Sequence, residues 1–240
     1  MTFGSLFAGI GGLDLGLERA GMECRWQVEI NDYAQRVLAK HWPNVRRHND
    51  IRTWPAGDTE RVDLICGGFP CQDISNAGKG EGLDGDRSGL FFEAVRVVRQ
   101  LRPRYVLLEN VAALLTRGLD RVHGAMAKIG YDSEWHCIPA CAVGAPHIRD
   151  RVFILAHAAS IRMERCRADW QQVTPISIGE KILGRDSPIC RGGNWETEPA
   201  VGRVANGVPA RVDRLKCLGN AVVPQVAEYI GRQIIGDGRT

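Results

Sequence analysis

The chain has 240 residues, of which 44% are hydrophobic and 25% charged, as in an ordinary globular protein of one or two domains. No apolar run approaches the roughly 20 residues of a membrane span, no signal-peptide pattern opens the chain, and eight scattered cysteines form no disulfide framework. We therefore expect a cytoplasmic protein that does not enter a membrane.

The net charge of +3 comes from one segment of the chain. Residues 160–217 carry ten Lys or Arg and seven Asp or Glu, whereas the rest of the chain is neutral. A modest basic excess in one segment is compatible with a surface that faces nucleic-acid phosphates. It is equally common on a solvated loop.

Short apolar runs alternate with amphipathic helical patterns over residues 1–156, which indicates an α/β sheet. The expected strands span 2–7, 25–30, 62–66, 104–109 and 151–156, with a further short strand ending near residue 50. The expected helices span 13–20, 33–41, 90–101, 119–129 and 224–235. The periodicity fades from about residue 157 to residue 199, and a turn is expected at 218–220.

A glycine-rich segment at 7–12 follows the first strand and opens the first helix, where glycines let a ligand approach the backbone. Glu29 ends the second strand, a suitable place for a carboxylate that holds ribose hydroxyls. Asp50 is suited to accept from an adenine amine, with Ile51 packed on the ring. Asp14 stands where the nicotinamide fingerprint requires glycine, so a nicotinamide oxidoreductase is disfavoured. The alternative is that the glycines only form a tight turn.

The segment 67–72, Gly-Gly-Phe-Pro-Cys-Gln, follows the apolar strand at 62–66. It places Cys71 in a turn at the mouth of the sheet, where such folds carry reactive groups. A thiolate is a strong nucleophile even when a small fraction is ionised. The alternative is a buried structural cysteine.

Two further groups of residues stand next to strands. Glu109 ends a strand expected beside the one that leads to Cys71, and a buried carboxyl there is ion-paired or functional. Arg149 and Arg151, one residue apart, are expected to point the same way and to suit phosphates and base edges. The alternative is a surface salt-bridge cluster with Asp150.

Together these segments resemble the cytosine-5 DNA methyltransferase family, in particular its compact phage-type and restriction–modification members. The resemblance covers nearly the whole chain, and the succession of Phe-Pro-Cys-Gln, Glu-Asn-Val and Gly-Asn-Ala-Val-Val-Pro is highly specific. It implies a Rossmann-like, doubly wound, S-adenosylmethionine-dependent methyltransferase sheet. Residues 1–156 and 218–240 would form the catalytic and cofactor-binding domain, and the irregular insert at 157–217 a short target-recognition region.

The family's reaction is transfer of a methyl group from S-adenosylmethionine to carbon 5 of a cytosine flipped out of duplex DNA. The resemblance implies that Cys71 adds to carbon 6 of the ring and that Glu109 acts at ring nitrogen 3. The implied catalytic residues are Cys71, Glu109, Arg149 and Arg151, and the implied DNA-binding residues are Gln72, Ser75, Arg149 and Arg151. The implied cofactor residues are Phe7, Gly9, Gly11, Glu29, Asp50, Ile51, Gly67, Pro70, Leu90, Asn220 and Val222.

The resemblance also implies double-stranded DNA as partner, a monomer in solution and, in a restriction–modification system, a cognate endonuclease. The glycine-rich segment 73–87 would act as a lid. Candidates for phosphate or guanine contacts are Arg162, Arg165, Arg167, Arg185 and Arg191. No metal is expected, because the C-x3-C spacing of Cys137 and Cys141 has no matching second pair.

Two other functions remain open at this point. An RNA methyltransferase of the same fold is one, although Phe69 before Pro70 favours DNA over the Pro-Pro-Cys context of the RNA-modifying branch. A DNA-binding protein that has lost the chemistry is the other, and the presence of Cys71, Glu109 and the cofactor residues argues against it.

Overall fold

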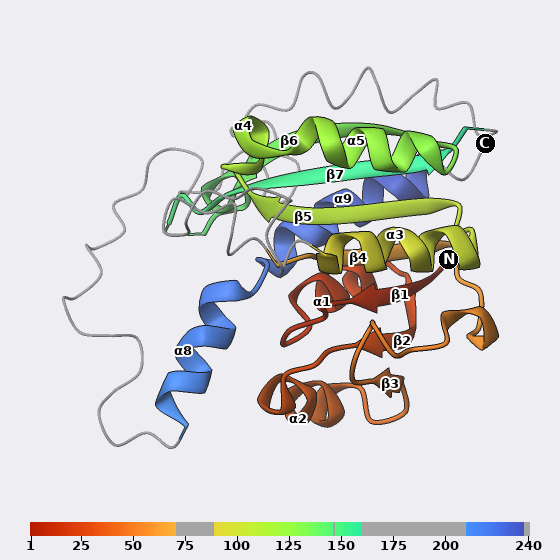
Figure 1. Cartoon of the computed structure of the whole chain (residues 1–240). Coiled ribbons are helices and arrows are strands. Elements are labelled where there is room, and N and C mark those ends of the chain that lie inside the picture. The colour runs from red at the N-terminus through yellow and green to blue at the C-terminus, as the bar shows by residue number, and fades with distance from the viewer. Residues whose placement is uncertain (71–88, 146, 160–209, 238–240) are drawn as a thin grey trace.

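The computed structural model describes residues 1–70, 89–145, 147–159 and 210–237 (Figure 1). Within them, one seven-stranded sheet has the order β3-β2-β1-β4-β5-β7-β6. The strands are β1 (Thr2–Leu6), β2 (Glu23–Val28), β3 (Arg46–His48), β4 (Leu64–Gly68), β5 (Tyr105–Val111), β6 (Tyr131–Pro139) and β7 (Asp150–Ala158). The strands β1 to β5 run parallel to one another, and β7 runs antiparallel between β5 and β6.

The edge strand β6 has no counterpart among the predicted strands. Its residues Asp132, Glu134 and His136 interrupt the apolar runs from which the other strands were predicted. Among the described strands β6 lies at the edge of the sheet, paired with β7, and most of its side chains are partly or fully exposed, so they need not be apolar. The link from β6 to β7 contains the short 3₁₀ helix η3 (Ala140–Val143) and no crossover helix, so the two strands pair antiparallel.

Helices cover both faces of the sheet. They are α1 (Gly12–Arg19), α2 (Asp32–His41), α3 (Gly89–Leu101), α4 (Leu114–Arg117), α5 (Leu119–Lys128), α8 (Arg211–Asn220) and α9 (Pro224–Asp237), with a 3₁₀ turn η1 (Ala56–Asp58). None of the helices in the described part of the chain is long and apolar enough to cross a membrane.

Two separate hydrophobic clusters lie on the two faces of the sheet. Helices α3 and α5 supply Phe91, Val98 and Met126 to one cluster. Helices α1 and α9 supply Leu17 and Ile230 to the other, and Figure 1 shows α9 behind the strands and α5 in front. The prediction of a doubly wound α/β sheet is therefore confirmed.

The predicted turn at 218–220 is wrong, because these residues form the last turn of helix α8. The Gly-Asn pair suggested a turn, but both residues are tolerated at the end of a helix. The apolar residues Val212, Leu215 and Leu218 of α8 are exposed, so this helix lacks the buried apolar face that the other long helices have. The predicted domain boundary between residues 217 and 218 consequently falls inside a helix.

The strand order has its switch point between β1 and β4, because the chain winds from β1 outward to β3 and then returns to β4 and β5. In open α/β sheets, ligands bind outside the carboxyl ends of the strands at this point. The glycine-rich turn after β1, the segment after β4 and the end of β5 meet there.

A polar cluster lies beneath this edge, inside the fold. Asp14 of α1 is fully buried and accepts hydrogen bonds from Ser5 Oγ at 3.0 Å and from Gln27 Nε2 at 2.8 Å. Cys24 Sγ lies 3.7 Å from the same carboxylate. Burial raises the pKa of Asp14 from 3.8 to about 6, although these hydrogen bonds oppose the shift.

Replacing Asp14 with asparagine is expected to remove a pH dependence of stability. The unfolded chain ionises Asp14 near pH 3.8 and the folded protein only near pH 6, so stability contributed at low pH is lost as the pH rises through this window. The loss reaches about 3 kcal/mol, since a tenfold change in an equilibrium constant is worth about 1.4 kcal/mol. An asparagine amide can donate to the Ser5 hydroxyl and carries no charge.

Urea unfolding of both proteins at about pH 4 and about pH 8 measures the effect. The Asp14→Asn variant should gain stability relative to the wild type at the higher pH. The same pH dependence in both proteins would contradict the raised pKa of Asp14.

Candidate active site

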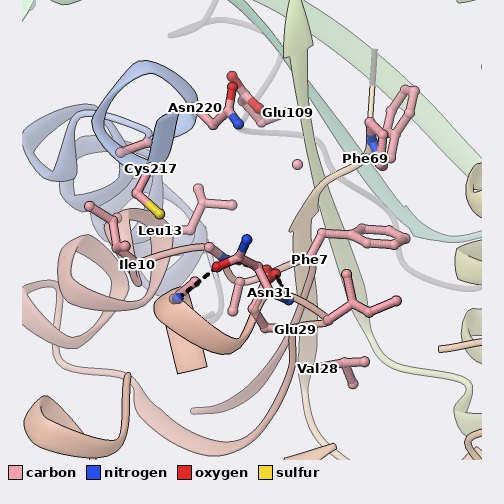
Figure 2. Close-up of a pocket in the computed structure, with 18 of the residues that line it drawn as sticks. Phe7, Ile10, Leu13, Val28, Glu29, Asn31, Phe69, Glu109, Cys217 and Asn220 are labelled. Carbon is pink, nitrogen blue, oxygen red and sulfur yellow. Dashed lines mark hydrogen bonds between the residues drawn. The ribbon is translucent and has the colours of Figure 1, made fainter. Parts of the chain in front are cut away.

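A cavity of about 580 Å³ opens at the switch point of the sheet (Figure 2). The predicted cofactor residues that line it are Phe7, Gly9, Glu29, Asp50, Ile51, Pro70, Leu90, Asn220 and Val222. Glu109, Val111 and Arg151 line the same cavity. The predicted cofactor residues and the predicted catalytic carboxyl therefore share one space.

Two predicted cofactor residues, Gly11 and Gly67, do not line this cavity. Gly11 has a left-handed φ of 83°, and a Cβ there would lie 2.5 Å from the Trp42 ring. A Cβ at Gly67 would lie 2.6 Å from the carbonyl oxygen of Leu6. Both glycines allow close packing, Gly11 against the Trp42 ring and Gly67 against the backbone of Leu6, and their contact with a cofactor stays a prediction.

Glu29 joins the glycine-rich turn to the end of β2. One carboxylate oxygen accepts from the backbone N–H of Gly9 and the other from that of Asn31, each at 2.7 Å (Figure 2). A carboxylate has about four acceptor positions, so roughly two remain for hydroxyl donors. The geometry suits the predicted contact with ribose.

Asp50 is held by its neighbour Arg52. The Arg52 Nη2 lies 2.7 Å from Asp50 Oδ2 and its Nε 3.0 Å from Oδ1, and these hydrogen bonds lower the pKa of Asp50. The next residue, Ile51, is only 3% exposed, and its carbonyl oxygen accepts from Arg96 Nη2 at 2.6 Å. The cavity wall thus offers an ionised acceptor beside an apolar side chain.

Phe7 has a φ of 52°, in the left-handed region that non-glycine residues rarely adopt. Such strain persists only where the surroundings hold it, and it gathers at functional sites. Phe7 packs against the hydrophobic cluster to which α3 contributes, and it lines the cavity (Figure 2). An aromatic ring is therefore presented to the space beside Glu29.

Glu109 is the buried carboxyl of the site, with 7% of its surface exposed. Burial raises its pKa to about 7, although the positive charges of Arg151 and Arg149 oppose the shift. The Nε of Arg151 lies 2.9 Å from Glu109 Oε1. A carboxylic acid that titrates near neutral pH can hold a proton and release it, as a general acid must.

Gly68 makes room for this carboxyl. A Cβ at Gly68 would lie 2.6 Å from Glu109 Oε2, which is the far end of a side chain, whereas a Cβ at Gly67 would meet the backbone of Leu6. The two neighbouring glycines therefore allow a matched experiment.

Gly68→Ala is expected to leave the protein folded but to displace the Glu109 carboxyl, and a displacement near 1 Å can slow a reaction that uses this carboxyl about 100-fold. Gly67→Ala is expected to lower the free energy of unfolding by about 1–3 kcal/mol, because backbone cannot yield as a side chain can. Urea unfolding and turnover measured on both variants separate the two effects. Normal turnover in Gly68→Ala would show that the reaction does not depend on the present position of the Glu109 carboxyl.

Asn110, the neighbour of Glu109, holds the segment that leads to Cys71. Its side chain is buried, and Nδ2 donates to the carbonyl oxygen of Phe69 at 3.2 Å, while Oδ1 accepts from the backbone N–H of Val111 at 2.9 Å. In the sequence Asn110 stands out only as part of the Glu-Asn-Val motif, and no local pattern predicts this contact. The next residue, Pro70, lines the cavity.

Several predicted residues lie outside the described part of the chain. These are Cys71, Gln72, Ser75, the predicted lid at 73–87 and the candidate arginines Arg162, Arg165, Arg167, Arg185 and Arg191. Their roles stay predictions.

The charges of Arg149 and Arg151 both act on Glu109, but their hydrogen bonds go in different directions, contrary to the common direction predicted from their spacing. Arg151, in β7, pairs with Glu109, whereas Arg149 Nη2 donates to the carbonyl oxygens of Gly219 and Ala221, each at 2.7 Å. Arg149 precedes the strand and has a φ of 37°, so the two-residue alternation of a strand does not reach it.

Two cavity residues were missed because they lie in the segment assigned to target recognition. Lys216 and Cys217 of α8 line the cavity, and Figure 2 shows the Cys217 side chain near Ile10 and Leu13. Burial and the negative charge of Glu29 raise the pKa of the Cys217 thiol. No sequence signal distinguishes this cysteine from the others.

Cys137 and Cys141 are free and exposed. Within the described ranges, no group of three or more His, Cys, Asp or Glu side chains is placed to hold a metal ion.

Comparisons with known proteins identify the family. The family model "C-5 cytosine-specific DNA methylase" matches residues 1–182. The chain is 35% identical over 160 residues to the type II methyltransferase M2.BsuMI of Bacillus subtilis, covering 63% of this chain and 41% of the relative. It is 35% identical over 203 residues to the type II methyltransferase M.CviJI of Paramecium bursaria Chlorella virus IL3A, covering 81% and 55%.

Solved structures agree in fold. The S. pombe Dnmt2 methyltransferase superposes with a TM-score of 0.57 at 20% identity, over 71% of this chain and 54% of that one. The chain spans about half the length of the curated relatives it matches. With the family model matched over most of its sequence, the chain belongs to the C-5 cytosine-specific DNA methylase family.

Proposed function

We propose that this protein transfers the methyl group of S-adenosylmethionine to carbon 5 of a cytosine in double-stranded DNA. One observation carries the proposal. Glu109, a buried carboxyl with a pKa raised to about 7, lines the same cavity as the predicted cofactor residues. The family and the names of the type II methyltransferase relatives support the same reaction.

The cavity suits S-adenosylmethionine in size and chemistry. Its volume of about 580 Å³ lies within the usual range of small-molecule sites. Glu29 and Asp50 offer acceptors to the ribose hydroxyls and the adenine amine, and Phe7, Ile51 and Leu90 offer apolar surface to the adenine ring. When bound, S-adenosylmethionine supplies an electrophilic methyl group, and the two carboxylates favour its positive charge.

The protein must first make carbon 5 of cytosine nucleophilic. The Cys71 thiolate adds to carbon 6, and the electron pair displaced from the ring is received at nitrogen 3, where protonated Glu109 donates. Carbon 5 would then attack the donor methyl group, with S-adenosylhomocysteine as the leaving group. Removal of the carbon-5 proton by a base, with return of the nitrogen-3 proton to Glu109, would expel the Cys71 thiolate. Arg151 fixes the position of the Glu109 carboxyl, with which it forms an ion pair.

The base must leave the DNA stack to reach this cavity, at a cost of a few kcal/mol. We assign contacts with the flipped nucleotide to Gln72, Ser75 and Arg151 on the strength of the family resemblance. The proposal extends to a monomer in the cytoplasm and, in a restriction–modification system, a cognate endonuclease.

The test is transfer of tritium from labelled S-adenosylmethionine to duplex DNA and, in parallel, to RNA. We expect label on DNA, recovered as 5-methylcytosine after digestion to nucleosides. Label on RNA alone would move the assignment to an RNA methyltransferase. No label on either, with the donor bound in a calorimetric titration, would indicate a DNA-binding protein without the chemistry.

A further inference from the structure

The junction between α8 and α9 carries Asn220 and Val222 to the wall of the cavity. Figure 1 shows α8 standing apart from the sheet at the lower left. No side chain of α8 belongs to either hydrophobic cluster of the described residues, and Val212, Leu215 and Leu218 are exposed. Apolar packing therefore does not fix this end of the junction.

Arg149 supplies a polar connection instead. Its Nη2 carries two hydrogens and donates to two carbonyl oxygens, those of Gly219 and Ala221, at 2.7 Å each. The last carbonyls of a helix have no partner within the helix, and a cation is favoured at this end of the helix dipole. One guanidinium nitrogen thus hydrogen-bonds to the backbone on both sides of Asn220.

The other side of the junction rests on α1. A Cβ at Gly12 would lie 2.4 Å from the carbonyl oxygen of Val222, so the two backbones are in close contact. The junction is held between the first residue of α1 and the guanidinium of Arg149. Without the hydrogen bonds from Arg149, the α8–α9 junction would keep its contact with α1 and lose its support on the other side.

Arg149 is itself held in an unusual conformation. Its φ of 37° lies in the left-handed region, which a residue with a Cβ keeps only where its surroundings hold it. Its charge also acts on Glu109, whose pKa it lowers against the effect of burial. The guanidinium of Arg149 therefore acts both on the cavity wall at Asn220 and Val222 and on the Glu109 carboxyl.

We propose that Arg149 is a positioning residue that holds the α8–α9 junction against the donor cavity. The identity of the donor rests on the proposed function, whereas the contact with the junction does not. Loss of Arg149 removes two charge-assisted hydrogen bonds, so Asn220 and Val222 lose their fixed place in the wall. Donor affinity should then fall while affinity for DNA changes less.

The experiment compares Arg149→Ala and Arg149→Lys with Arg232→Ala. Arg232 is an exposed arginine of α9 that pairs with Glu228. Its replacement removes a positive charge from α9 without touching the α8–α9 junction, and it therefore serves as the control. Titration calorimetry with S-adenosylhomocysteine measures affinity for the donor site. Hydrogen exchange of peptides spanning 216–224, without any ligand, measures the hold on the junction directly.

For Arg149→Ala we expect donor affinity about tenfold or more weaker, because charge-assisted hydrogen bonds have net contributions of that order. Exchange at 216–224 should be at least about fivefold faster, and Arg232→Ala should match the wild type within about twofold. Arg149→Lys should lie between the two, since its ammonium keeps the charge but loses the planar fork.

Unchanged exchange at 216–224 in Arg149→Ala would overturn the positioning role. If Arg149→Ala does not fold, the same comparison is made with Arg149→Lys, where wild-type exchange and wild-type affinity would overturn it. If the wild type itself binds no S-adenosylhomocysteine, the proposed function fails, and the exchange measurement still decides whether Arg149 holds the junction.

Discussion

A Cys71→Ser variant is expected to transfer no detectable methyl group to DNA while it still binds the donor. A serine hydroxyl is not ionised near neutral pH, whereas a cysteine is partly thiolate and a stronger nucleophile toward carbon. Without addition to carbon 6, carbon 5 of cytosine stays too electron-poor to attack a methyl group. The first chemical step is therefore blocked.

Donor binding should survive because most of the described residues that line the cavity come from segments other than the one that contains Cys71. Glu29 is fixed by backbone N–H groups, and the segment before Cys71 is held by the hydrogen bond from Asn110 to Phe69. Tritium transfer and titration with S-adenosylhomocysteine measure the two properties on the same preparation. Label on cytosine at the wild-type rate would exclude Cys71 as the nucleophile.

Glu109→Gln is expected to slow methyl transfer about 10²- to 10⁴-fold, the usual contribution of a positioned acid. The amide can still donate a hydrogen bond but cannot deliver a proton. The melting temperature should stay near that of the wild type, because burial makes the charged form of Glu109 costly and the amide is neutral. Single-turnover rates on a saturating duplex measure the loss.

The pH profile gives a second readout of the same residue. Because the pKa of Glu109 is raised to about 7, the active, protonated form is lost as the pH rises through 7, and kcat/KM should fall there. Arg151 opposes this shift, so Arg151→Gln should raise the pKa of Glu109 further and move the fall to higher pH. Glu109→Gln should lack the fall. A fall that stays in place in all three proteins would belong to another group.

The order of the chemistry-bearing segments could be predicted from the sequence because each has a local physical cause. The strands β4 and β5 are buried on both faces and begin with continuous apolar runs, Leu-Ile-Cys and Tyr-Val-Leu-Leu. Glycines after a strand mark turns that need close backbone approach, which is true of the turn after β1. Glu109 was predicted to be ion-paired or functional, since an acid at a buried strand end needs a partner, and it pairs with Arg151.

Other predictions failed where the tertiary structure places residues differently from what the local sequence pattern suggests. The Gly219-Asn220 pair reads as a turn, yet the helix α8 continues through it. Arg149 and Arg151 stand one residue apart, yet one meets helix-end carbonyls and the other meets Glu109. Spacing predicts a shared direction only inside a regular strand, and Arg149 lies outside it.

The sequence by itself therefore determined the sheet class, the order of the motifs and the residue types available for chemistry, because hydrophobic periodicity and backbone freedom are local properties. The tertiary structure decided which groups meet. Arg149 and Gly219 are 70 positions apart, and Lys216 and Cys217 line the same cavity as residues of the chain's N-terminal part. Contacts of this kind depend on how distant segments pack together, which no local pattern records.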